Sequence, residues 1–127
     1  MAVEQTIWKI DGRKATKVRE ARLEKELLLE DLIHDDVSIL DDGWLLLGRQ
    51  VPTAYGKYID LLAVDRNGNL VIIELKRDRT PRDVVAQALD YASWVRDLSA
   101  DEIAAIHQAY TTKFGIEGTL YARFQAK

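Results

Sequence analysis

Two apolar runs joined by a short polar turn constrain the fold of this chain more than any other feature of its sequence. The runs cover residues 58–65 and 70–76, and the chain between them reads Asp-Arg-Asn-Gly-Asn from Asp65 to Asn69. An Asn-Gly pair between two such runs is a strong local signal for a β-hairpin. The sequence therefore predicts two antiparallel strands with their turn near Gly68.

The length of this turn decides which residues of the two strands face each other. A three-residue loop with Gly68 in the left-handed position pairs Asp65 with Asn69, and it places Asp60 directly opposite Glu74. A two-residue loop pairs residues 66 and 69 instead, and it sends the two acids to opposite faces of the sheet. The turn sequence favours the first register.

Hydrophobic periodicity and turn residues predict the remaining elements, which are a short strand near residues 6–10, a helix over 19–33 and a strand over 44–51. Capping signals predict two further helices, one over residues 81–96 that Thr80 and Pro81 start, and one that Ser99 starts and that ends near residue 110. This order predicts a mixed α/β domain, an α+β meander sheet flanked by helices.

Composition excludes several classes of protein. Apolar residues make up 47% and charged residues 31% of the 127 residues, which is typical of a folded globular domain. The chain has no cysteine, which excludes disulfides and thiolate chemistry, and its two histidines are far apart, which argues against a histidine zinc site. Without a long apolar run or a hydrophobic N-terminal segment, we expect a cytoplasmic protein that does not enter a membrane.

The apolar strand at residues 70–76 carries an acid and a lysine two positions apart. Alternation along a strand sends Glu74 and Lys76 to one face, and the hairpin adds Asp60 beside them. Two carboxylates and an ammonium among apolar residues are costly unless they are paired. A divalent cation such as Mg²⁺ pairs them through carboxylate oxygens, and an ion pair between Lys76 and one of the acids is an equally good alternative.

The predicted helices add further candidates. On a helical wheel, Glu26 and Glu30 fall within the apolar arc of the first helix, so they are the helix acids best placed to reach the sheet, unless they extend to solvent at its edge. On the helix over residues 81–96, Gln87 and Tyr91 lie on the flank of the apolar stripe, where they either line a site beside the sheet or pack against it.

Together these motifs resemble the PD-(D/E)XK nuclease superfamily, and within it the catalytic domain of NucS-like endonucleases. The motifs are Gly56-x-x-x-Asp60, the run Val71-Ile-Ile-Glu-Leu-Lys-Arg77, and Gln87-x-x-x-Tyr91, all after an acidic helix. An aspartate followed by Glu-x-Lys is a weak pattern by itself, whereas the complete set is much more specific. The resemblance covers roughly residues 20–95 and implies a restriction-endonuclease-like core with αβββα order.

The resemblance implies hydrolysis of phosphodiester bonds in DNA. Asp60, Glu74 and Glu26 would hold Mg²⁺ or Mn²⁺, with Glu30 as the competing acid from the first helix. Lys76 would position or deprotonate the attacking water and stabilise the charge that develops on the phosphate.

The resemblance also implies contacts with the substrate. Gln87 would orient the substrate or a water beside the metal site. Arg77, Arg79 and Arg82 follow the acid-bearing strand and would contact DNA phosphates, with Tyr91 beside them. The net charge of −3 argues against a generally basic nucleic-acid-binding protein, yet an excess of bases over residues 49–82 leaves room for a local basic face.

The chain departs from the family pattern at three points. Gln50 follows an arginine where the family prefers an acid, and we count no active-site loss there. The family's N-terminal DNA-binding domain has no counterpart, and no closing core strand follows residue 96. We therefore expect a module of a longer protein or a homodimer, divided into an arm (1–18), a nuclease-like core (19–98) and a C-terminal helix and tail (99–127).

Three functions are compatible with these residues. The first is a metal-dependent DNA endonuclease domain, which the intact Asp60, Glu74 and Lys76 favour. The second is a non-catalytic DNA- or partner-binding module on the same fold. The third is a structural domain whose carboxylates form ion pairs.

Overall fold

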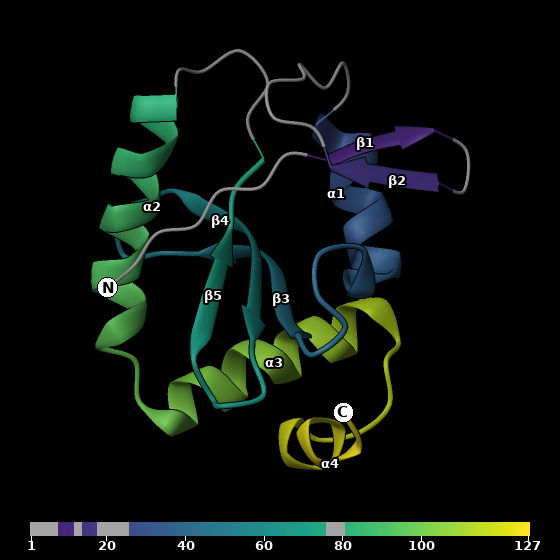
Figure 1. The fold of residues 1–127 in the computed structure, drawn as a ribbon. Coiled ribbons are helices and arrows are strands. Elements are labelled where there is room, and N and C mark those ends of the chain that lie inside the picture. The colour runs from purple at the N-terminus through teal and green to yellow at the C-terminus, as the bar shows by residue number, and fades with distance from the viewer. Residues whose placement is uncertain (1–7, 12–13, 18–25, 76–80) are drawn as a thin grey trace.

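A three-stranded antiparallel sheet lies at the centre of the computed structural model, which describes residues 8–11, 14–17, 26–75 and 81–127 (Figure 1). The strands, in their spatial order, are β3 (Leu45–Pro52), β4 (Tyr58–Val64) and β5 (Leu70–Ile73). The helices are α1 (Glu26–Asp35), α2 (Pro81–Arg96), α3 (Ala100–Phe114) and α4 (Leu120–Ala126), with a short 3-10 helix at Val37–Ile39. The predicted α+β class is confirmed, as is the order of one helix, three strands and one helix.

The β4–β5 hairpin has the register of the three-residue loop. Leu61 pairs with Ile73, and the main-chain N–H of Asp65 donates to the carbonyl of Asn69 at 2.9 Å. Gly68 has a φ of +83°, which is the left-handed conformation that this loop requires of its glycine. The predicted register, which brings residues 60 and 74 together, is thus confirmed.

Strand β5 is shorter than predicted. The sequence predicts a strand over residues 70–76, but regular pairing ends at Ile73, and the N–H of Leu75 donates to the carboxylate of Asp60 at 2.8 Å. A side chain here takes the place of a main-chain carbonyl as acceptor, so the ladder cannot continue in its regular form. The prediction was wrong about the strand end because it relied on apolar alternation alone.

Apolar residues pack on both faces of the sheet. On one face, Tyr91 and Val95 of α2 belong to a core cluster with sheet residues such as Leu62. On the other face, Leu29 and Ile33 of α1 pack with a second cluster, made up of Leu46, Leu61, Ala63, Ile73 and Tyr110. Figure 1 shows the sheet between α1 and α2.

Helix α3 joins these two clusters. Ile103 and Ile106 pack against the cluster on the α2 face, whereas Tyr110 and Phe114 belong to or pack against the cluster on the α1 face. Ser99 and Glu102 form the predicted capping box, but the helix continues past residue 110 and ends at Phe114, where Gly115 with a φ of +64° forms the C-cap. The core of the sheet therefore includes α3.

The ends of the chain contain elements that the sequence did not indicate. Strand β1 (Trp8–Asp11) corresponds to the short strand predicted near residues 6–10, but its antiparallel partner β2 (Lys14–Lys17) was not predicted. Helix α4 was not predicted either, and it begins after Thr119, whose side chain accepts from the N–H of Ala122. Helix α1 ends two residues beyond its predicted end, and the predicted residues 19–25 lie outside the described part of the chain.

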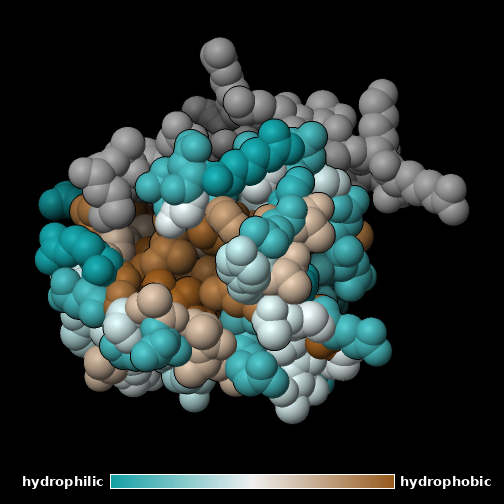
Figure 2. Space-filling view, turned by 90° about the horizontal axis from the view of Figure 1, so that it is seen from below, coloured by the Kyte–Doolittle hydropathy of each residue, from teal (hydrophilic) through white to brown (hydrophobic). Residues whose placement is uncertain are grey.

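The underside of the molecule, near α3 and α4, shows hydrophobic side chains gathered in a hollow with hydrophilic side chains around it (Figure 2). Among the described residues, no helix has the length and apolar character needed to cross a membrane.

Candidate functional site

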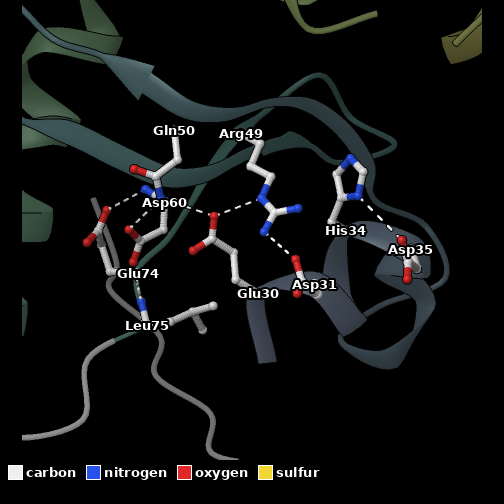
Figure 3. A network of polar contacts seen from close by, with 9 residues as sticks. All are labelled: Glu30, Asp31, His34, Asp35, Arg49, Gln50, Asp60, Glu74 and Leu75. Atoms are coloured by element: carbon white, nitrogen blue, oxygen red, sulfur yellow. Dashed lines mark hydrogen bonds and ion pairs between the residues drawn. The ribbon is translucent and has the colours of Figure 1, made fainter. Parts of the chain in front are cut away.

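Asp60 and Glu74 meet where β4 passes the end of β5. The main-chain N–H of Asp60 donates to Oε1 of Glu74 at 3.1 Å, and Oδ2 of Asp60 accepts from the N–H of Leu75 at 2.8 Å. Asp60 is only 8% exposed. Each acid is thus fixed by the main chain of the neighbouring segment, and the two carboxylates are adjacent (Figure 3).

Glu30 of α1 is connected to this pair through an amide. Gln50 Nε2 donates to Oε1 of Glu30 at 3.0 Å and to Oδ1 of Asp60 at 3.2 Å (Figure 3). Glu30 is 7% exposed, so it is as buried as Asp60. The helix acid that the structure links to the sheet acids is therefore Glu30, the competitor of Glu26 in the sequence analysis.

Arg49 provides the charge that accompanies this buried acid. Its Nε donates to Glu30 at 2.9 Å and its Nη2 contacts Asp31, while the side chain of Arg49 is 14% exposed. Burial by itself would lower the pKa of Arg49, but the hydrogen bonds and charges of Asp31 and Glu30 outweigh it and raise the pKa. The guanidinium therefore stays charged and holds α1 against β3.

The adjacent carboxylates of Asp60 and Glu74 are suitable ligands for a hard divalent cation. Carboxylate oxygens are the ligands that Mg²⁺ prefers, and Mg²⁺ is commonly held by one or two protein carboxylates together with water and substrate phosphate. Within the ranges that the structure describes, no group of three or more acidic or histidine side chains is placed to hold one ion. The adjacent Asp60 and Glu74 fit a two-carboxylate site, and the predicted third ligand Glu26 stays a prediction, because its side chain lies outside the described ones.

Several predicted site residues also lie outside the described part of the chain, and these are Lys76, Arg77 and Arg79. Arg82, in the first turn of α2, is described and exposed, as a contact with a charged partner requires. The roles predicted for these four residues stay predictions.

Gln87 and Tyr91 are described, and they form a pair within α2. Gln87 Nε2 donates to the hydroxyl of Tyr91 at 2.8 Å. Tyr91 is 1% exposed and belongs to the core on the α2 face of the sheet. Its side chain is therefore buried in the core beside the sheet, and the DNA contact predicted for it stays a prediction.

The sequence did not indicate the roles of Arg49 and Gln50, although Gln50 departs from the family pattern. The register of β3 against β4 reveals them, since Arg49 pairs with Leu61 and Val51 with Ile59, so that Gln50 lies across from Asp60. That register shifts between Leu46 and Gly48. Gly48, inside the predicted strand over residues 44–51, is the signal that could have indicated this shift, because a glycine in a strand interior often marks a β-bulge.

The family to which the chain belongs is shown by comparison with known proteins. Residues 24–118 match the family described as the endonuclease NucS C-terminal domain. The chain belongs to this family. Membership of the NucS C-terminal domain family confirms the relation to NucS endonucleases that the motifs indicated.

Individual relatives with the name endonuclease NucS come from several organisms. The protein from Pyrococcus furiosus is 30% identical over 81 residues, a stretch that covers 64% of this chain and 30% of the relative. The protein from Streptomyces griseus is 42% identical over 66 residues, which cover 52% of this chain and 29% of the relative. The protein from Corynebacterium jeikeium is 38% identical over 80 residues, which cover 63% of this chain and 31% of the relative.

The matched segment thus spans less than a third of the length of these NucS relatives. No solved structure matches this chain.

Proposed function

We propose that this chain is a metal-dependent DNA endonuclease domain that hydrolyses phosphodiester bonds. The observation that carries the proposal is the meeting of Asp60 and Glu74 at the open end of the β4–β5 hairpin. Membership of the NucS C-terminal domain family supports it, because the relatives are named as endonucleases.

In this proposal, Asp60 and Glu74 would hold Mg²⁺ or Mn²⁺, and an acid of α1, Glu26 or Glu30, would act beside them. The bound ion would polarise the scissile phosphate and lower the pKa of a coordinated water. Lys76 would orient the attacking water and stabilise the negative charge that develops on the phosphate.

Gln87 would orient the substrate or a water in this proposal, and Tyr91 would hold the Gln87 amide in place through their hydrogen bond. Arg77, Arg79 and Arg82 would contact DNA phosphates, since they follow Glu74 closely in the sequence. Contacts of this kind position a protein on DNA and do not read its sequence.

Cleavage assays test the proposal directly. The chain would be incubated with supercoiled, linear, branched and single-stranded DNA in the presence of Mg²⁺, Mn²⁺ or a chelator. We expect cleavage of at least one substrate that depends on the cation. Retained DNA binding without cleavage of any substrate would replace the enzyme proposal with a binding module.

Two substitutions assign the roles of Glu74 and Lys76. Glu74→Gln removes a charged ligand, so it should weaken both cleavage and the rise in melting temperature that Mg²⁺ causes. Lys76→Ala should lower the cleavage rate by about 10²–10³-fold and leave the Mg²⁺-dependent rise nearly unchanged. Glu117→Gln is the matched control, because Glu117 is an exposed acid between α3 and α4. If Glu74→Gln or Lys76→Ala cleaved DNA at the wild-type rate, the role proposed for that residue would be wrong.

The second candidate is a non-catalytic DNA- or partner-binding module, which the exposed Arg82 in the first turn of α2 fits as well as it fits an enzyme. Under either candidate, Arg82→Ala should weaken DNA binding at all sequences and reduce the salt dependence by about one counterion. Arg96→Ala, an exposed arginine in the last turn of the same helix, is the control. Only the cleavage assay distinguishes the two candidate functions.

A further inference from the structure

The backbone of Gln50 is unusual for a residue with a side chain. Its φ is 51°, and within the described residues it is the one non-glycine position with a positive φ. An L-residue adopts this left-handed conformation at a cost, and such strain persists where surrounding interactions enforce it. The glycine-like conformation of Gln50 thus calls for a physical reason.

The reason lies in the direction of two consecutive side chains. Along a regular strand, residues 49 and 50 would point to opposite faces of the sheet. Instead, Arg49 Nε and Gln50 Nε2 both donate to Oε1 of Glu30, at 2.9 and 3.0 Å. The left-handed turn at Gln50 interrupts the alternation and brings its amide to the same side as the guanidinium.

The amide then lies between two buried carboxylates. Its nitrogen carries two N–H groups, and it donates one bond to Glu30 and one to Asp60, which lies opposite on β4. A carboxylate of the same length would add a negative charge at this position. Gln50 therefore brings Glu30 close to Asp60 without increasing the repulsion between the acids.

We infer that Gln50 is a positioning residue for the proposed metal site, and that its neutral amide sets the affinity of the site for divalent cations by orienting the carboxylate of Asp60. This inference rests on the proposed function. Hydrogen-bond partners that orient a metal ligand commonly change metal affinity by about 10–100-fold when they are removed. Gln50 makes its bond to Oδ1 of Asp60, while Leu75 bonds Oδ2, so together they fix the plane of the carboxylate.

Two substitutions of Gln50 should change metal affinity in opposite directions. Gln50→Gly removes the amide, so the cation concentration for half-maximal stabilisation should rise by about 10–100-fold, whereas the melting temperature in chelator reflects both the relief of the left-handed strain and the loss of two hydrogen bonds. Gln50→Glu places a third carboxylate beside Asp60, so the melting temperature in chelator should fall and that concentration should decrease.

The experiment is a series of thermal melts of the whole chain against increasing Mg²⁺ and, separately, Mn²⁺, with cleavage rates measured on the same samples. Gln108→Glu, on the exposed surface of α3, adds the same charge away from the site and serves as control. A purely structural role for Gln50 predicts lower melting temperatures and unchanged cation dependence in both variants, and that result overturns the inference. So does a change in the same direction for both variants.

The wild type separates this inference from the proposed function. If cations raise its melting temperature and support cleavage, but both Gln50 variants titrate as the wild type does, only the inference fails. If neither cation changes the melting temperature or supports cleavage by the wild type, the proposed metal site and the inference fail together.

Discussion

The two ends of the β4–β5 hairpin are held together in different ways. At the turn end, the side chain of Asp65 accepts from the N–H groups of Asn67 and Asn69, at 2.9 and 2.8 Å, and its partners lie two and four residues away in the chain. At the open end, Asp60 contacts Leu75, and an amide from β3 connects it to Glu30 of α1.

The acids at these two ends also differ in their surroundings. Asp65 is at the surface in a turn of polar residues, whereas Asp60 and Glu30 are both less than 9% exposed. A local network at the surface stabilises a turn at little cost, because water solvates the charge. A buried network gathers acids from three segments, which is unfavourable for stability unless positive charges such as that of Arg49 compensate it. We therefore expect substitutions at the open end to change activity and cation binding, and substitutions at the turn end to change stability alone.

The largest expected effect is on activity at the open end. Asp60→Asn keeps the size of the side chain and removes the charge that the proposed cation requires, so cleavage should fall by about 10²–10³-fold or more. Cleavage kinetics on the substrate that the wild type prefers would measure this loss. Asp65→Asn, the same substitution at the turn end, is the control and should cleave at the normal rate. An equal loss in both variants would contradict the division between the two ends.

The second prediction compares one ion pair at each end. Arg49→Ala leaves Glu30 buried without its guanidinium and should reduce the free energy of unfolding by about 3 kcal/mol. Arg66 lies in the turn, 3.7 Å from Asp42, and both side chains are more than 60% exposed. Arg66→Ala should therefore change stability by less than about 0.5 kcal/mol. Urea denaturation of both variants measures the difference, and similar losses would show that burial does not separate the two pairs.

The third prediction concerns the backbone of the turn. A methyl group on Gly68 meets no atom within 4 Å, but its φ of +83° disfavours any other residue. Gly68→Ala should lower the free energy of unfolding by about 1 kcal/mol, through strain alone. Its rise in melting temperature with Mg²⁺ should match that of the wild type. A changed cation dependence would mean that the turn and the open end are coupled.

The smallest expected effect is a pH dependence at the turn end. The N–H of Asn69, followed by the smaller contributions of the Asn69 side chain and of Asn67, holds the pKa of Asp65 below its ordinary value of 3.8. The charged form is favoured in the folded state, so its stabilisation is present above pH 3.8 and disappears as the pH falls through the lower folded pKa. Thermal melts at a series of acidic pH values measure this effect. The difference in melting temperature between the wild type and Asp65→Asn should become smaller as the pH falls. If the difference in melting temperature stayed the same at every pH, the stabilisation by Asp65 would come from its shape and hydrogen bonds and not from its charge.

The same contrast explains what could be predicted. The hairpin register and the capping box at Ser99 were correct, because each depends on hydrogen bonds between residues at most four positions apart. Apolar alternation, by contrast, gave too long a strand β5, since it contains no information about the carboxylate of Asp60 that accepts from Leu75. The helix wheel placed both Glu26 and Glu30 on the inner face but did not distinguish between them.

The sequence by itself favoured the register in which Asp60 and Glu74 meet, because the turn with Gly68 sets the pairing of the two strands, and the structure confirms that register. Only the tertiary structure decided that Arg49 and Gln50 join them. Their bonds to Glu30 span 19 and 20 residues of chain, and they depend on a register shift in β3 and on the left-handed conformation at Gln50. The physical reason is that contacts over such a separation are fixed by how α1 packs against the sheet, and no local pattern of residues encodes that packing.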